Sequence, residues 1–436
     1  MVNALEKTFP TTSESIALPR SRSKKRFITF RVSWISCFFL AVIICMNPIR
    51  HIFGLSSSII SYGCYFLFVS SSVADLIINR KKNIGFKGRG SSFYYLFVGF
   101  VIYTFIAPFF NISTLFVAFK MLIYLLILCS ARLLNHKDIH LLFKLIVLIN
   151  IIYSILLITG ARSIQDFDLE SDMNYLNLSL TIGLSLTILL TKLFLMFALN
   201  KIKVFSFVVE LIMALILFLG ANSFAARSTY LFPVLTVALI VFSLVFFNFK
   251  LFVKLAIPLT IVVIVGIIIF INHSSDYAFS RMMALFNNLS SEDRIYIWGK
   301  CLEIIGDEKL FLFGGGINKF EAEIGFYPHN FIIQFVGEIG LIGVLICVYI
   351  IGFFFYAFVH IFSLLRKPTR RRVNATIFPI IVFSSFLFIL LNFLKSFTIY
   401  EGLLLYLFLV FSIKEVGVCL KKGKIKNAKV KHRYSN

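Results

Sequence analysis

Charged residues are scarce in this chain, and their scarcity excludes an ordinary soluble protein. They make up 14% of the 436 residues, whereas soluble proteins carry about 25%. Apolar residues replace them, because 59% of the chain is hydrophobic and 53 residues are phenylalanine. Repeated apolar runs of roughly 20 residues, each able to cross a hydrocarbon core of about 30 Å, predict an all-α polytopic integral membrane protein.

Several motifs of other protein classes are missing as well. The seven cysteines form no CxxC pair, and only Cys301 falls in a segment predicted to lie on the outer side of the membrane, so we expect no disulfide framework. Among the acids of the loop 272–338, no HExxH or DxD spacing singles out a metal site, and we expect no metal and no cofactor. The apolar runs are continuous rather than alternating, which excludes an outer-membrane barrel. We find no internal repeat of the kind that two-halved transporters show.

The apolar runs predict about twelve transmembrane helices. They are expected at residues 32–47, 53–78, 93–110, 112–131, 139–160, 175–199, 204–221, 230–247, 254–271, 339–364, 376–393 and 402–414. This pattern divides the chain into a basic N-terminal tail (1–31), spans one to nine (32–271), one larger loop with short helices (272–338), spans ten to twelve (339–414) and a basic C-terminal tail (415–436).

The net charge of +23 comes from clusters of Lys and Arg beside the apolar spans. Such clusters are typical of the cytoplasmic side of membrane proteins, where they attract anionic lipid headgroups. We therefore interpret the charge as a topology signal and expect no nucleic-acid partner. Both termini are then cytoplasmic, and the loop 272–338 lies on the outer side. The clusters are Arg20–Arg31, Arg80–Arg89, Arg366–Arg372 and Lys421–Arg433.

Charged side chains within the predicted spans are few. We expect those present to extend toward the membrane surface, because each lies within a few turns of a span end. An ion-coupled transporter needs several charged groups near mid-membrane, so this distribution disfavours that class. The residues are Lys120, Lys144, Lys192 and Glu210.

The loop 272–338 contains a readable helix. A capping-box-like start at Ser290–Asp293 precedes apolar residues at helical spacing, and Gly306 is a suitable end. The apolar face, Ile295, Trp298, Leu302 and Ile305, is expected to lie on the membrane surface or against the bundle. The glycine triplet at 314–316 then predicts a flexible link, and residues 330–337 predict a short re-entrant or interfacial turn.

His329 is the candidate for proton transfer. It follows Pro328 and precedes Asn330 at the outer edge of a predicted span. An imidazole there titrates near neutral pH and can exchange a proton with a substrate. The alternative is a histidine that caps the following helix or rests at the interface. The other histidines have no supporting context and are assigned to loops and interfaces: His51, His136, His140, His273, His360 and His432.

Four cations on the expected outer side stand out, because the basic clusters of this chain are predicted to lie inside. They are Arg227, Arg281, Arg294 and Lys395. Guanidinium groups bind phosphate oxygens in bidentate fashion, so a diphosphate on the outer face would account for them. The alternative for Arg227, which opens a span, is an interfacial arginine that extends its side chain to water.

In chain order, five segments resemble the O-antigen polymerase and O-antigen ligase superfamily of bacterial envelopes, most specifically over residues 281–343. The segments are Arg227-Ser-Thr-Tyr-Leu-Phe-Pro, Arg294-x3-Trp298, Gly314-Gly-Gly316, Pro328-His329-Asn330 and Gly337-Glu338-x-Gly340-x-x-Gly343.

The resemblance implies a GT-C-like glycosyltransferase of the bacterial inner membrane that is metal-independent, needs no cofactor and inverts the anomeric carbon. Its donor would be an undecaprenyl-diphosphate-linked glycan on the periplasmic face, and a protein that regulates glycan length would be a further partner. Membrane lipid would surround it. In this chain the resemblance assigns the diphosphate to the four outer cations. It gives His329 and Arg294 catalytic roles, and Asn330 and Trp298 supporting ones.

The family contains two activities. A polymerase joins repeat units on one lipid carrier to a second carrier-linked unit, whereas a ligase passes the finished glycan to lipid A–core. The glycine-rich stretch before Pro-His-Asn favours the polymerase. The short acidic link 161–174 departs from polymerases that have two large Arg-rich outer loops. Two other classes stay open, a flippase or exporter of lipid-linked sugar and a membrane scaffold protein.

Overall fold

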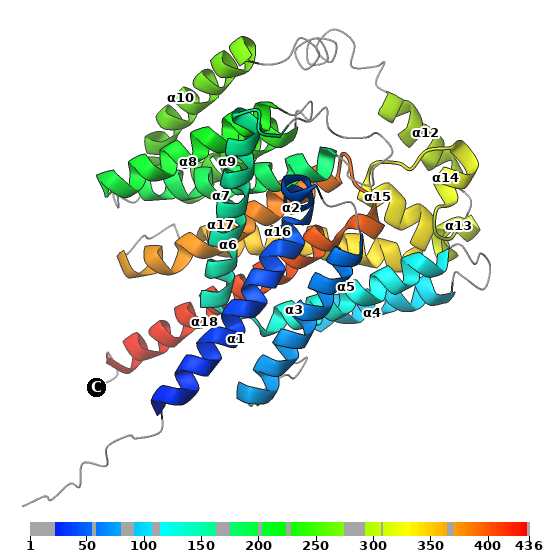
Figure 1. The fold of residues 1–436 in the computed structure, drawn as a ribbon, viewed down its shortest axis with the longest axis horizontal. Coiled ribbons are helices and arrows are strands. Elements are labelled where there is room, and N and C mark those ends of the chain that lie inside the picture. Colours follow the sequence, from blue (N-terminus) through cyan, green and yellow to red (C-terminus); the bar gives the residue numbers. More distant parts are fainter. Residues whose placement is uncertain are drawn as a thin grey trace, which may run out of the picture.

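The fold is a bundle of helices (Figure 1). All regular structure is helical, with no strand in the ranges that the computed structural model describes. These ranges are 22–54, 58–79, 91–106, 114–162, 175–198, 203–223, 228–273, 293–306, 308–363 and 370–433.

Twelve of the helices in these ranges are long. They are α1 (Arg22–Ile44), α3 (Ser58–Asn79), α4 (Ser91–Ile106), α5 (Leu115–Leu133), α6 (His136–Ile158), α7 (Tyr175–Ala198), α8 (Val204–Asn222), α9 (Ser228–Phe247), α10 (Phe249–His273), α16 (Leu341–Ser363), α17 (Arg370–Phe393) and α18 (Leu403–Arg433). The short ones are α2 (Met46–Phe53), α12 (Asp293–Ile305), α13 (Glu308–Phe313), α14 (Lys319–Ile324), α15 (Phe331–Gln334), the π-helix η5 (Phe335–Ile339) and the 3₁₀-helix η6 (Ile399–Glu401).

The helices agree with an all-α membrane protein. Within the described ranges, eight helices are each long and apolar enough to cross a membrane, and the count rises to nine if α1 and α2, bent by 77°, form one span. α4 is apolar but shorter. Each predicted span overlaps one long helix, although α18 continues to Arg433, through much of the predicted C-terminal tail. α1 likewise begins at Arg22, inside the predicted N-terminal tail.

The centre of the bundle is formed by α7 and α17. Of the apolar window of each helix, 83% and 89% is buried, against 17% for α3 and 28% for α16. α7 packs against α8, α9 and α17, while α17 also packs against α18. The outer helices present large apolar side chains outward, such as Phe66, Leu215 and Phe355. Surfaces of this kind suit contact with lipid chains rather than with water.

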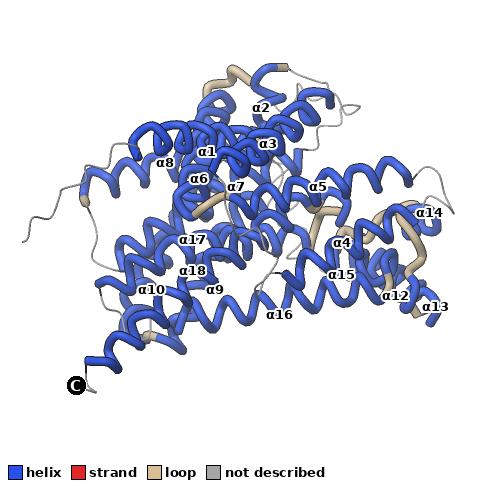
Figure 2. The backbone as a smooth tube through the Cα atoms, turned by 90° about the horizontal axis from the view of Figure 1, so that it is seen from below, coloured by secondary structure: helices blue, strands red, loops and turns tan. Residues whose placement is uncertain are grey.

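The bundle has two distinct ends, which Figures 1 and 2 show. At one end α12 to α15 and η5 gather beside the start of α16, and we call this the loop end. Helix α5 connects the loop end to the other end of the bundle. The short helix η6 packs against α5, and the backbone carbonyl of Arg132, in the last turn of α5, accepts a hydrogen bond from the Lys414 ammonium group on α18. We call the second end, where α5 meets α6 and α18, the terminal end.

Candidate functional site

The turn Pro328–Asn330 is held from both sides. The indole Nε1 of Trp298, on α12, donates a hydrogen bond of 2.7 Å to the Pro328 carbonyl oxygen. The Asn330 side chain accepts from the backbone N–H groups of Ile332 (3.0 Å) and Ile333 (3.3 Å), and so caps α15. The two predicted supporting residues therefore hold the backbone on either side of His329.

His329 has an unusual backbone conformation. Its φ is +50°, in the left-handed region that few residues other than glycine adopt. Such conformations cost about 1–3 kcal/mol and persist only where the surrounding structure enforces them. The ring is half-buried and lies 4.0 Å, centroid to centroid, from that of Tyr327.

The contacts of the His329 ring indicate which nitrogen carries its proton. Nδ1 lies 3.4 Å from the carbonyl oxygen of Ser396. A carbonyl oxygen only accepts hydrogen bonds, so in the neutral ring Nδ1 is the donor and Nε2 is left to accept a proton. Ser396 belongs to the link between α17 and α18, residues 394–402, which we call the α17–α18 link.

The α17–α18 link also carries Lys395. The half-buried Lys395 extends its ammonium group over the ring of Phe232, in the second turn of α9, at 5.6 Å from the ring centroid. The link therefore touches both the His329 turn and the first turns of α9. Two of the predicted site residues, His329 and Lys395, are in this way brought to neighbouring positions by segments about 66 residues apart (395 − 329).

The glycine triplet is packed, and the prediction of a flexible link was wrong. Gly315 N donates to the Gly337 carbonyl (2.8 Å), and Gly316 N donates to the Glu338 carbonyl (3.1 Å). Gly340 has a φ of +67°, and a Cβ added there would lie 2.4 Å from the Gly314 nitrogen. Here two backbones cross at a distance that no side chain permits. The crossing anchors the glycine triplet to Gly340, the residue between η5 and α16.

Sequence reasoning did not single out Glu338, which lies in the centre of this region. Its side chain is fully buried in η5. The Tyr400 hydroxyl (2.7 Å) and the Gln334 amide Nε2 (3.2 Å) both donate to its Oε2. Burial raises the pKa of Glu338 to about 7, although these two hydrogen bonds oppose the shift. The available signal was Glu338 as the single charged residue in the stretch from 331 to 350.

Of the three predicted arginines, the structure describes only the backbone of Arg294. Arg294 is the second residue of α12, the helix that holds the His329 turn through Trp298. Its side chain, like the whole of Arg227 and Arg281, lies outside what the structure describes. The diphosphate site that these residues suggest stays a prediction.

The helix predicted after residue 290 exists, and its predicted apolar face is buried against the protein only in part. Trp298 and Ile305 are partly buried as expected, whereas Ile295 and Leu302 are 53% and 58% exposed. Cys301 instead is fully buried. The side of α12 that meets the protein therefore includes Cys301, which is buried, and Trp298, which bonds to the Pro328 carbonyl.

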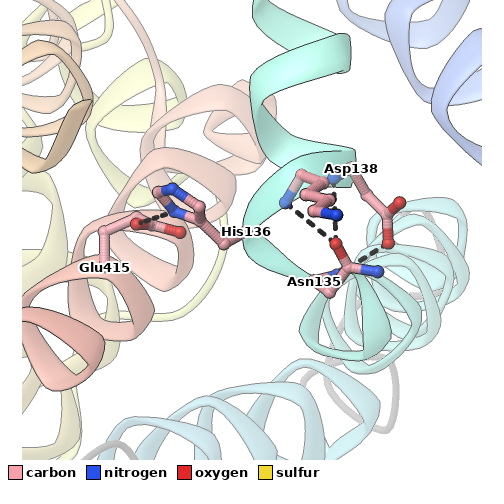
Figure 3. A network of polar contacts seen from close by, with 5 residues as sticks. Asn135, His136, Asp138 and Glu415 are labelled. Atoms are coloured by element: carbon pink, nitrogen blue, oxygen red, sulfur yellow. Dashed lines mark hydrogen bonds and ion pairs between the residues drawn. The ribbon is translucent and has the colours of Figure 1, made fainter. Parts of the chain in front are cut away.

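Two histidines that were assigned to loops and interfaces form specific contacts instead. His51 is 5% exposed, and its Nδ1 lies 2.9 Å from the buried Tyr153 hydroxyl. His136, at the terminal end, lies 2.6 Å from the Oε2 of the buried Glu415 (Figure 3). None of the contacts described for the His329 turn involves His51 or His136. Sequence spacing contains no signal for such pairs.

Two of the charged residues within the spans also pair with each other. The ammonium group of Lys192 lies 2.5 Å from Oε1 of Glu210, which joins α7 to α8. In the part of the chain that the structure describes, no three His, Cys, Asp or Glu side chains gather closely enough to hold a metal ion.

In comparisons with known proteins, no protein-family model matches the chain and no curated protein matches it. The resemblance over residues 281–343 is therefore a hypothesis that rests on the motifs themselves.

Proposed function

We propose that this chain is an O-antigen polymerase of the bacterial inner membrane. It has about twelve transmembrane helices in a GT-C-like arrangement, cytoplasmic termini and a periplasmic loop end. It joins undecaprenyl-diphosphate-linked repeat units without a metal or cofactor. One observation carries the proposal: the turn that bears His329 meets the link that bears Lys395, through the contact between Nδ1 and the Ser396 carbonyl.

His329 serves as the general base. A sugar hydroxyl is a poor nucleophile, and a positioned imidazole accelerates its attack by about 10²–10⁴-fold. The acceptor hydroxyl oxygen bonds to the anomeric carbon of the donor glycan, and its proton passes to Nε2. The bond between that carbon and the diphosphate breaks on the opposite face, so that the configuration inverts. The left-handed backbone at His329 supports this role, because enforced strain of this kind is concentrated at functional sites.

Cations stabilise the leaving group. The departing lipid diphosphate gains negative charge in the transition state, and preorganised positive groups lower that barrier. Lys395 is suitably placed on the α17–α18 link, next to the residue that contacts His329. Arg227, Arg281 and Arg294 complete the diphosphate site in this proposal. A base beside cations at the edge of the membrane suits a transferase better than a flippase, which moves its cargo without proton abstraction.

The test is the glycan ladder of cells that carry single variants at matched membrane abundance. We expect His329→Ala and Arg294→Ala to leave lipid A–core capped by a single repeat unit. The control is His360→Ala, because His360 contacts only the Tyr356 carbonyl of its own helix among the hydrogen bonds described. It should give the wild-type ladder.

Other outcomes identify the other activities. Bare core with long glycan left on the lipid carrier would indicate a ligase. Bare core with no long glycan on the carrier would indicate a flippase. A wild-type ladder from both site variants would refute the assignment of His329 and Arg294.

A further inference from the structure

The buried carboxyl of Glu338 lies at a junction of four chain segments. Its own segment, η5, follows the His329 turn and α15. Its backbone carbonyl accepts from the Tyr103 hydroxyl of α4 (2.7 Å) and from Gly316 N (3.1 Å). Its side chain accepts from Tyr400, on η6 of the α17–α18 link. A glutamate without access to water is costly, so its retention at this position calls for a reason.

A second side chain of the same region holds the same link. The Gln334 amide donates to Glu338 through Nε2 and accepts from Ile399 N through Oε1, at 2.9 Å. Glu338, Gln334 and Tyr400 thus form one buried network that binds two adjacent residues of the link. We call these three residues the Glu338 network. Buried networks of this kind specify one arrangement of the segments that they join.

Aromatic packing completes the attachment of the link. Phe100 of α4 stacks on the Tyr400 ring (6.3 Å between centroids) and meets the Phe335 ring edge-on (5.5 Å). These ring contacts hold the segments together, but packed rings can shift along one another with little loss of contact. The hydrogen bonds of the Glu338 network set the register, because they end on single atoms with directional geometry.

The register of the link decides the orientation of the His329 ring. Ser396 lies three residues before Ile399, so that movement of residues 399–400 shifts the carbonyl that faces Nδ1. We propose that Glu338 is a positioning residue: through Gln334 and Tyr400 it holds the α17–α18 link so that the Ser396 carbonyl retains the proton of His329 on Nδ1 and keeps Nε2 unprotonated. The use of Nε2 as a base rests on the proposed function.

The experiment removes one hydrogen bond of the network at a time. Tyr400→Phe deletes the hydroxyl and keeps the ring that packs on Phe100. We expect kcat for glycan transfer by the purified full-length protein to fall by about 10- to 100-fold with KM nearly unchanged, the range that follows from small misplacement of a catalytic group. Tyr94→Phe is the matched control, because it deletes another buried hydroxyl of the bundle, bonded to the Leu128 carbonyl.

A second readout does not depend on activity. In protein labelled with ¹⁵N-histidine, the His329 signals are assigned by their loss in His329→Gln. We expect Nδ1 to be protonated and Nε2 unprotonated in the wild type, and a mixture of both tautomers in Tyr400→Phe. Glu338→Gln keeps the shape and an acceptor for Tyr400, so it should preserve the wild-type tautomer, whereas Glu338→Ala should not.

The outcomes separate the two proposals. If the wild type transfers no glycan while the tautomer still depends on Tyr400, the proposed function fails and the positioning role stands. A wild type with its proton on Nε2 would overturn the positioning role. So would Tyr400→Phe and Glu338→Ala proteins that both keep wild-type kcat and wild-type nitrogen signals.

Discussion

The two ends of the bundle are held together by different chemistry. At the terminal end, acidic side chains bind partners on other helices: Glu415 lies against His136 (Figure 3), and Asp138 accepts a hydrogen bond from the Ser33 hydroxyl. At the loop end, neutral donors and backbone carbonyls predominate, and backbones cross at Gly314 and Gly340.

This difference suggests that the terminal end contributes mainly to the stability of the fold, whereas the loop end sets the geometry of the candidate site. A side-chain pair can be replaced at a moderate cost, because neighbouring helices continue to pack through their apolar faces. A backbone crossing or a left-handed residue accepts very few amino acids. We therefore expect changes at the terminal end to lower stability with little effect on activity per folded molecule, whereas changes at the loop end should alter the site itself.

The largest effect is expected at the crossing. Gly340→Val forces a β-branched residue into a φ of +67° and places its Cβ 2.4 Å from the Gly314 nitrogen. Strain and overpacking together should cost about 3–5 kcal/mol. Gel filtration in detergent should show loss of the folded protein. Gly352→Ala is the control, because a Cβ at that helical position meets nothing within 4 Å, and a folding yield equal for both variants would contradict the crossing.

The next effect is a pH dependence at the loop end. Burial raises the pKa of Glu338 from 4.5 to about 7, so the folded protein binds this proton more tightly than the unfolded chain. The stability linked to it is therefore complete below about pH 4.5 and is lost as the pH rises through about 7, by at most about 3 kcal/mol. The ionisable groups that interact with Glu338 are Tyr400, Tyr103, Cys301 and Glu321.

The measurement for this prediction is the midpoint of thermal unfolding in detergent between pH 5 and pH 8. Glu338→Gln should flatten the profile over this range, since an amide does not titrate. Equal slopes in wild type and variant would show that Glu338 keeps an ordinary pKa.

A smaller loss of folding stability is expected when the contact between His136 and Glu415 at the terminal end is removed. Glu415→Ala removes a fully buried carboxylate and leaves the partly exposed His136 without this partner. Because His136 keeps access to water, we expect about 1–3 kcal/mol rather than the full cost of breaking a buried pair. Glycan transfer per folded molecule should not change. A large fall in kcat would contradict the division between the two ends.

The smallest effect is expected at the start of α6. The Asn135 side chain accepts from Lys137 N and Asp138 N, while the Asp138 carboxylate accepts from Asn135 N, a reciprocal capping box (Figure 3). Asn135→Ala should cost about 1 kcal/mol. Because Asp138 also accepts from Ser33, the test is the double variant with Asp138→Asn, whose shift in the unfolding midpoint should be smaller than the sum of the two single shifts if the box acts as a unit. Shifts that add fully in the double variant would show that the two residues act separately.

The helices and their order could be predicted from the sequence. Apolar runs report the need to satisfy backbone hydrogen bonds within a membrane, and this need is local. The helix of Asp293–Ile305 was likewise readable from its spacing. Its buried face was not, because Cys301 is buried and Leu302 exposed through contacts with α15 and η5, which lie further along the chain.

The candidate site was predicted in part. His329 and Lys395 drew attention because a polar residue in an apolar chain is costly. Glu338 did not, although a single acid beside a span carries the same signal. Local patterns give the composition of a site, but they do not tell which polar groups are partners.

By itself, the sequence determined that the chain is helical, that its long apolar helices are suited to a membrane, where these long helices lie and which residues are too polar for lipid. Only the tertiary structure decided that Ser396 faces His329, that Tyr400 and Gln334 meet Glu338, and that two glycine backbones cross. The physical reason is the distance along the chain over which each interaction acts. Hydropathy and helix caps act within a few residues, whereas the register of the α17–α18 link is set by directional bonds between segments that are distant in the chain and adjacent only after the helices pack.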